Sequence, residues 1–324
     1  MIYRFPHAAA YLAFTKLGYV NLRRLLSDGK RDRSARVHGY VQAQLGEHGY
    51  LIFVRNGEPF HAFRFEGTER GPIALGAALR QLEREGERGE VGRIGYFGAP
   101  EEQLRAMLST ALSPARDAGV PCEPSHPELF FSALGKLGFS GVLELFDGGA
   151  FHYLLFDDGR FRTGYFSGGD GGSPAGERVR EVLRTAGDSL RTRLHDLLRE
   201  CPAQPTAAEL ELFEGFLTGL AAVLRGGMQE EEVRGLFAEA GARSERARPA
   251  VEAFGWQGEG VRNRDTLLPA DALADGVAAW TVEVVTLGSD RLGLDPSEVV
   301  ERAAGRHRLA LAERGFFQRL PWLV

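Results

Sequence analysis

The sequence predicts an α+β protein in which two related modules, each with a small antiparallel β-meander and helices, are followed by an all-helical C-terminal domain. Residues 39–67 and 141–168 support the repeat, because each has three apolar stretches separated by glycine-containing turns, as in a three-stranded meander. A proline-rich segment lies between the two. After Pro202 the β pattern gives way to apolar residues at helical spacing.

The first module is expected to span residues 1–112 and to begin with two helical segments. Leucines recur at roughly helical intervals through His7–Leu17 and Asn21–Ser27, and the Asp28-Gly29 pair offers a residue type that ends helices. In the meander that follows, Asn56-Gly57 suits a type I′ turn, because both central residues of that turn need positive φ.

After the meander the first module is expected to alternate helix and strand. The pattern predicts a helix from Ile73 to about Glu85, a short strand over Arg93–Phe97 and a helix from Pro100 through Leu112. Acidic residues in the first turn of that last helix favour its start, because they complement the helix dipole.

A linker is predicted over residues 113–127, where four prolines interrupt any hydrophobic period. The second module, residues 128–200, repeats the plan of the first. We expect a helix over Glu128–Leu137 and a meander with Asp158-Gly159 at its hairpin. A long amphipathic helix is expected from Glu177 to about Arg199, with a break near Gly187 as the alternative.

The C-terminal domain is expected to span residues 203–324 and to be all-helical. Its last helix has favourable start chemistry, with Asp295 as N-cap, Pro296 as first helical residue and Glu298 at the capping-box position. The predicted helices run over 210–225, 229–240, 270–286 and 296–314.

The apolar end of the chain contains four candidates for contact with a partner protein. Exposed together, these side chains would leave a large apolar patch in water, so we expect the tail to dock on a surface. The chain's own helical domain is the expected surface, and a partner is the alternative. The four candidates are Phe316, Phe317, Leu320 and Trp322.

Basic residues gather between Arg23 and Arg36, although the whole chain has a net charge of −5. Such a segment can meet phosphates or an acidic partner. The alternatives are a solvated face and pairing with the acidic stretch Thr206–Glu298 of the same chain. Four of these arginines are candidate partner-binding residues: Arg23, Arg24, Arg31 and Arg33.

Composition argues against a disulfide-rich, secreted, membrane-spanning or nucleic-acid-binding protein. With only two cysteines, Cys122 and Cys201, among 324 residues, we expect neither a disulfide framework nor a cysteine-rich metal site, and a cytoplasmic location is favoured. The N-terminus lacks the pattern of a secretory signal, and no apolar run is long enough to cross a bilayer. The negative net charge weighs against nucleic-acid binding.

Chemically capable residues do not form a recognised catalytic or cofactor motif. The glycines of Gly92–Gly98 have the wrong spacing for a dinucleotide site, and the loop GGDGGSPAGER lacks the Lys-Ser/Thr ending of a P-loop. His61 falls in a predicted strand, and Cys122 with His126 lacks the second half of a zinc site. No catalytic, cofactor-binding or metal-binding residue is therefore predicted, and no cofactor.

A series of short motifs in the first module carries a family resemblance. In order they are NLRRLL, G-Y-V, an apolar strand, an N-G turn, FHAFRF, GAALRQL and G-R-I-G-Y-F, over about residues 19–112. This order resembles the bacterial PATAN-type domain, named from the amino-terminal region of the PatA regulator. Residues 127–199 look like a diverged copy that keeps S-G-V-L-E-L and a D-G-R turn. The basic stretch Lys30–Arg36 and Pro59 depart from the family pattern.

The resemblance implies non-enzymatic modules that act with response regulators, small-GTPase regulators or motility and polarity systems. We therefore expect a non-catalytic intracellular interaction or regulatory protein of bacterial signalling, with an unidentified protein partner and a helical docking or effector domain. The competing hypothesis is an enzyme or small-ligand sensor with a site between the two α+β modules.

Overall fold

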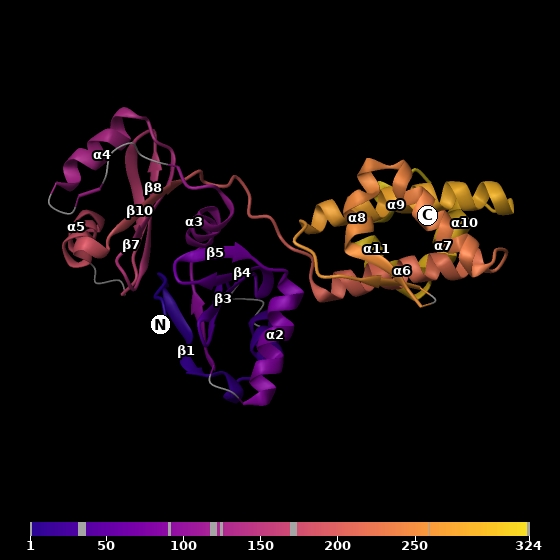
Figure 1. Ribbon diagram of the computed structural model, residues 1–324, viewed down its shortest axis with the longest axis horizontal. Helices are drawn as coiled ribbons and strands as arrows, with labels where there is room; N and C mark the ends of the chain where they lie inside the picture. The colour runs from indigo at the N-terminus through magenta and orange to yellow at the C-terminus, as the bar shows by residue number, and fades with distance from the viewer. Residues whose placement is uncertain are drawn as a thin grey trace. The chain divides into compact units, whose positions relative to one another are not determined.

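The computed structural model describes residues 2–31, 37–89, 92–116, 122–123, 126–168, 174–258 and 260–322, with the backbone alone for 27–31. The chain divides into two compact units (Figure 1). The first comprises Met1–Ile73 and Ala77–Cys201, and the second Ala74–Gly76 and Pro202–Val324. The first unit is α+β with antiparallel sheets, and the second is mainly helical.

A six-stranded antiparallel sheet forms the first part of the first unit, in the order β1-β6-β2-β3-β4-β5. Strands β2 and β3 are buried along almost their whole length, so both faces of the sheet are covered there, and β4 is buried in its middle but exposed at its ends. Helices α1, α2 and α3 accompany it. The strands are β1 (Ala9–Lys16), β2 (Gly39–Leu45), β3 (His48–Arg55), β4 (Glu58–Glu66), β5 (Glu69–Pro72) and β6 (Gly92–Gly98); the helices are α1 (Leu22–Arg31), α2 (Leu75–Arg88) and α3 (Glu101–Leu112).

A four-stranded antiparallel sheet follows in the same unit, in the order β10-β7-β8-β9. Phe130, Leu143, Leu154 and Leu183 belong to the core between this sheet and its helices. Its elements are α4 (Pro127–Lys136), β7 (Gly141–Phe146), β8 (Phe151–Asp157), β9 (Arg160–Tyr165), α5 (Ala175–Ala186), the 3₁₀ turn η2 (Gly187–Ser189) and β10 (Arg191–His195).

Both predicted hairpin turns are confirmed. Asn56 and Gly57 have φ values of 53° and 78°, and Asp158 and Gly159 have 46° and 71°, as a type I′ turn requires. The turns join β3 to β4 and β8 to β9. The two predicted meanders, β2-β3-β4 and β7-β8-β9, are therefore present, each within a larger sheet.

The start of the chain differs from the prediction. His7–Leu17 is not a helix: β1 pairs antiparallel with β6, and the short 3₁₀ turn η1 (Leu17–Tyr19) follows. The leucine spacing was a weak signal there, and the open edge of β6 supplies hydrogen-bond partners that local sequence cannot reveal. The next helix also runs past Gly29 to Arg31, since one glycine inside a helix costs only about 1 kcal/mol.

The end of the first unit is a second correction. The helix predicted from Glu177 to about Arg199 ends at Ala186, because Gly187 takes a positive φ of 49°, so the alternative of a break near Gly187 is the correct one. The chain turns there and returns as β10, which pairs with β7. Leu190 and Leu194, expected on one helical stripe, instead contribute to the core of the sheet from this returning segment.

The second unit is not all-helical. A two-stranded hairpin of β11 (Phe254–Gln257) and β12 (Gly260–Asn263) interrupts its helices. The predicted single helix over 296–314 is also broken, at Gly305 with φ 42°. The helices are α6 (Ala207–Arg225), α7 (Glu230–Arg243), α8 (Arg248–Ala253), α9 (Ala270–Leu292), α10 (Pro296–Ala304) and α11 (Arg308–Glu313), with 3₁₀ turns η3 (Glu245–Ala247), η4 (Gly305–His307) and η5 (Phe317–Arg319).

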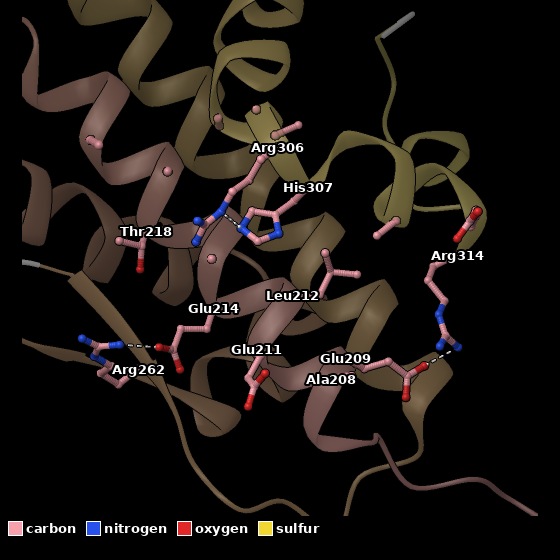
Figure 2. Close-up of a pocket in the computed structure, with 18 residues that line it drawn as sticks. Ala208, Glu209, Glu211, Leu212, Glu214, Thr218, Arg262, Arg306, His307 and Arg314 are labelled. Carbon is pink, nitrogen blue, oxygen red and sulfur yellow. Dashed lines mark hydrogen bonds and ion pairs between the residues drawn. The ribbon is translucent and has the colours of Figure 1, made fainter. Parts of the chain in front are cut away.

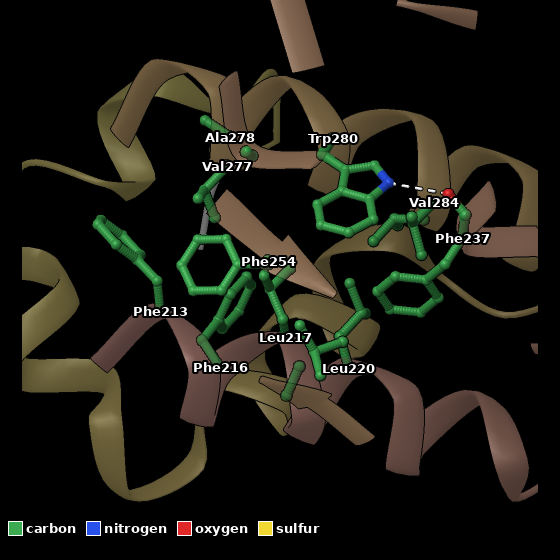
Figure 3. Close-up of a cluster of buried hydrophobic side chains, with 14 of the residues drawn as sticks. Phe213, Phe216, Leu217, Leu220, Phe237, Phe254, Val277, Ala278, Trp280 and Val284 are labelled. Carbon is green, nitrogen blue, oxygen red and sulfur yellow. Dashed lines mark hydrogen bonds between the residues drawn. The ribbon is translucent and has the colours of Figure 1, made fainter. Parts of the chain in front are cut away.

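An aromatic core holds the second unit together (Figure 3). Phe216 on α6 and Phe254 on β11 are fully or almost fully buried. Trp280 on α9 donates its indole N–H to the carbonyl oxygen of Phe237 at 3.0 Å, which satisfies the one polar atom of that ring. As predicted, Asp295 caps α10 by accepting a hydrogen bond from the backbone N–H of Glu298 at 3.1 Å.

Within the first unit, the N-terminal segment joins the two sheets. Arg4 forms a parallel bridge with Ala150, next to β8. Phe5 is buried and stacks on Phe151 with ring centroids 5.0 Å apart. Tyr40 of β2 donates its hydroxyl to the carbonyl oxygen of Pro6 at 3.0 Å. The segment therefore has bonds to both sheets.

Candidate functional site

An opening in the second unit follows one face of α6. It has a volume of ≈ 810 Å³ and is lined by α6, by the stretch from Ala303 to Arg314 and by Arg262 of β12 (Figure 2). We call it the α6 groove. Most α6 residues in its wall have another wall residue three or four positions away, so they fall on one broad helical face. These residues are Ala208, Glu209, Glu211, Leu212, Glu214, Gly215, Thr218, Gly219 and Ala222.

Glycine on α6 allows the close approach that shapes the groove. A Cβ at Gly219 would lie 2.4 Å from the carbonyl oxygen of Ala303, and a Cβ at Gly215 would lie 2.5 Å from Nε2 of His307. Larger residues would push α10 and η4 away from α6. Thr218 links α6 to β12, because its hydroxyl donates a hydrogen bond to the carbonyl oxygen of Val261 at 3.2 Å.

The start of α6 is fixed by a capping box. The backbone N–H of Glu209 donates to the hydroxyl of Thr206, and the Glu209 carboxylate accepts from the backbone N–H of Thr206 at 2.8 Å. The other oxygen of Glu209 pairs with Arg314 at 2.6 Å. Glu209 is therefore held in one position at one end of the groove.

Glu214 is held in a similar way at the other end of this row of glutamates. It pairs with Arg262 at 2.6 Å and accepts the backbone N–H of Asn263 at 3.0 Å. Partial burial alone would raise the pKa of Glu214, but these hydrogen bonds lower it overall. The side chain is therefore a carboxylate throughout the neutral range.

Glu211 lies between these two fixed carboxylates and is exposed (Figure 2). Among the described residues it forms no ion pair or hydrogen bond. Across the groove, the exposed Arg306 donates from Nε to Nε2 of His307 at 3.3 Å. The groove thus presents an unpaired carboxylate on one wall and a guanidinium on the opposite wall.

These groups can bind side chains of both charges but do not form a catalytic arrangement. A nucleophile activated by a base would need a hydroxyl or thiol hydrogen-bonded to that base, whereas Thr218 donates to the backbone. Within the described ranges, no group of three or more His, Cys, Asp or Glu side chains is placed to hold a metal ion. Nor does any described helix have the length and apolar character to span a bilayer.

Two of the four tail candidates belong to the core of their own unit. Phe316 is fully buried and packs against Phe216 with ring centroids 4.9 Å apart, and Leu320 is 8% exposed. Phe317 and Trp322 are partly buried against the same core. Up to Trp322, the last residue that the structure describes, the tail docks on its own domain as expected, and Phe316 and Leu320 offer almost no surface to a partner.

The structure describes the side chains of two of the four basic candidates, Arg23 and Arg24. Arg23 on α1 forms a bidentate pair with Glu83 on α2, at 2.7 and 3.0 Å, as in the alternative of internal pairing, although with an acidic residue of its own module. The backbone N–H of Arg24 donates to the side chain of Asn21, which caps α1. Arg33 and the side chain of Arg31 lie outside the described residues.

Asp147, His152 and Ser167 lie together in the first unit but do not form a hydrolytic triad. Nε2 of His152 lies 3.4 Å from Asp147, while its Nδ1 accepts the backbone N–H of Ser167 at 3.2 Å. The hydroxyl of Ser167 donates to the carbonyl oxygen of Phe151 at 2.7 Å rather than to the histidine. Burial lowers the pKa of His152, so the ring is a neutral structural link.

Sequence reasoning missed the α6 groove. The signal that could have found it is the spacing of Gly215, Gly219 and Ala222 on a helix whose other face is apolar, since small residues every three or four positions mark close helix packing. The charged residues of the groove come from distant parts of the chain.

Searches of family models, curated proteins and solved structures find no match to this chain.

Proposed function

We propose that the chain is a non-catalytic interaction or regulatory protein whose α6 groove binds a peptide segment of a partner protein. The observation that carries the proposal is Glu211, an exposed carboxylate without a partner among the described residues, between two glutamates that are already paired. A basic side chain of the partner would pair with Glu211, and an acidic one with Arg306. Arg306 is held beforehand by its hydrogen bond to His307, which reduces the ordering needed on binding at that wall.

The cellular setting that we propose is bacterial signalling, in a two-component, small-GTPase or motility and polarity system. Its support is the PATAN-type motif order of the first module, which retains its meander and its Asn56-Gly57 turn in the structure. In such a protein the α+β unit and the helical unit would each present a binding surface.

The alternative is a small-ligand site between the two α+β modules, and the region where they meet is filled by aromatic side chains. The stacked rings of Phe5 and Phe151 lie where the modules meet, and Tyr3 makes edge contacts with Phe65 of one module and Phe146 of the other. These side chains contact one another and fill that region. A ligand there would have to displace them.

Affinity capture from a lysate of the source cells tests the proposal. The purified chain is compared with Glu211→Arg and with Asp290→Arg, a matched charge reversal on an exposed carboxylate of α9. We expect a set of proteins that wild type and Asp290→Arg retain and Glu211→Arg loses. Equal retention by all three, or none by any, would contradict a groove that recognises protein.

A thermal-shift screen with a metabolite library distinguishes the alternative. A ligand at a hundred times its dissociation constant stabilises the folded state by about 2.7 kcal/mol. A stabilising small molecule whose effect survives Glu211→Arg would favour the sensor or enzyme.

A further inference from the structure

Strand β1 is an open edge of the six-stranded sheet. In the strand order it has one neighbour, β6. Whereas β2 is buried along almost its whole length, β1 exposes five of its eight residues. Tyr11 is 55% exposed, as one of the large apolar side chains left at the surface. The outward N–H and C=O groups of such a strand can pair with another strand.

Natural edge strands are usually protected by charges, prolines or short length. Among residues 8–16, AAAYLAFTK, the only charged residue is Lys16 and there is no proline. Two register shifts against β6 occur near Leu12, yet the strand remains extended across both. Its outer edge is thus long and neutral, with the single charge at one end.

We propose that β1 pairs antiparallel with β1 of a second copy of the chain, which makes a two-fold symmetric dimer through a continuous sheet. A second copy offers an edge that is equally long and neutral, and the position of Lys16 favours the antiparallel direction. Antiparallel pairing centred on Ala13 sets Lys16 of each copy opposite Ala10 of the other, so no like charges meet. Parallel pairing would place the two lysines side by side. A two-fold axis makes this contact self-complementary.

Sedimentation equilibrium of the full chain over a concentration series tests the proposal. We expect wild type to dimerise. Ala13→Lys puts two lysines together at the two-fold axis and raises the dissociation constant by roughly tenfold, because like charges on facing strands repel. Ala10→Glu places a carboxylate near Lys16 of the partner copy and leaves the dimer as tight or tighter.

Ala312→Lys is the matched control, since Ala312 is exposed on α11, and it should leave the dissociation constant unchanged. Far-UV circular dichroism melts establish that each variant folds. A wild type that stays monomeric throughout the series overturns the proposal and leaves the edge to a strand of another protein. A dimer that Ala13→Lys leaves as tight as wild type also overturns it, since the contact would then lie elsewhere.

Discussion

The guanidinium of Arg70 in β5 is ion-paired with the carboxylate of Glu144 in β7, and the two side chains are only 4% and 3% exposed. Arg70 also donates to the hydroxyls of Thr110 and Tyr153, each at 3.2 Å, and lies over the ring of Phe151. Burial alone would lower the pKa of Arg70, but the charge of Glu144 raises it overall. A fully satisfied buried charge pair therefore links the first α+β module to the second.

Removing one partner of this pair should destabilise the first unit strongly. Arg70→Met leaves the Glu144 carboxylate buried without a countercharge, and we expect a loss of about 3–5 kcal/mol in the free energy of unfolding. The double variant Arg70→Met/Glu144→Leu should lose much less, because no buried charge remains. Urea denaturation followed by far-UV circular dichroism measures both; a double variant less stable than Arg70→Met would contradict this account.

Tryptophan fluorescence gives the internal control for that experiment. All three tryptophans, Trp256, Trp280 and Trp322, belong to the second unit. Their unfolding transition should therefore be unchanged in the Arg70 variants.

His61 should make the first unit less stable as the pH falls below neutral. It is 4% exposed and stacks on Phe63, and burial lowers its pKa from 6.5 to about 4. Because the unfolded chain binds this proton more readily, stability is full above pH 6.5 and declines as pH falls toward 4. The loss between pH 7 and pH 5 from this residue is about 2 kcal/mol.

Urea denaturation at the two pH values measures this loss. His61→Phe should reduce it, with a remainder because burial also lowers the pKa of His152 and His195. His126→Phe, at an exposed position, serves as control. An unchanged pH dependence in His61→Phe would exclude His61 as a cause.

Gly159→Val should destabilise the second sheet by at least about 2 kcal/mol. The position has φ 71°, and a Cβ there would lie 2.6 Å from Cα of Gly135 on α4. Gly71→Val is the control, since that strand glycine has open space around its Cβ position and no positive φ. Circular dichroism in urea compares them; equal stability of the two variants would show that the turn tolerates a branched residue.

Phe316→Ala should destabilise the second unit by about 3–5 kcal/mol, because it removes a fully buried ring from the core. Leu309→Ala is the matched control, since Leu309 is 73% exposed. Tryptophan fluorescence in urea measures both. A small effect of Phe316→Ala would mean that the tail contributes little to the core that it contacts.

Features set by a few adjacent residues could be predicted from the sequence. The turns at Asn56-Gly57 and Asp158-Gly159 follow from the backbone freedom of those residue types, and Asp295 caps α10 for a similarly local reason. Strands β1 and β10 were missed because each is defined by an open sheet edge formed by distant residues. The hairpin β11–β12 was missed for lack of a strong turn signal at Gly258.

The candidate site was harder to predict than the fold. Glu214 and Glu211 look like ordinary exposed residues of an amphipathic helix in the sequence. Only the fold shows that Arg262 neutralises the first and that the second has no partner among the described residues. The tail gave the opposite outcome, because its apolar character alone indicated that Phe316 would be buried.

The N-terminal segment also constrains the order in which the chain can fold during synthesis. Tyr3 and Phe5 leave the ribosome well before Phe146 and Phe151, yet their ring contacts include both of these residues. Until then these rings lack part of their final packing, although the first sheet is already complete in sequence. Since such long-range contacts slow folding and prolong the exposure of apolar surface, the nascent first module should be most prone to aggregation just before β8 emerges.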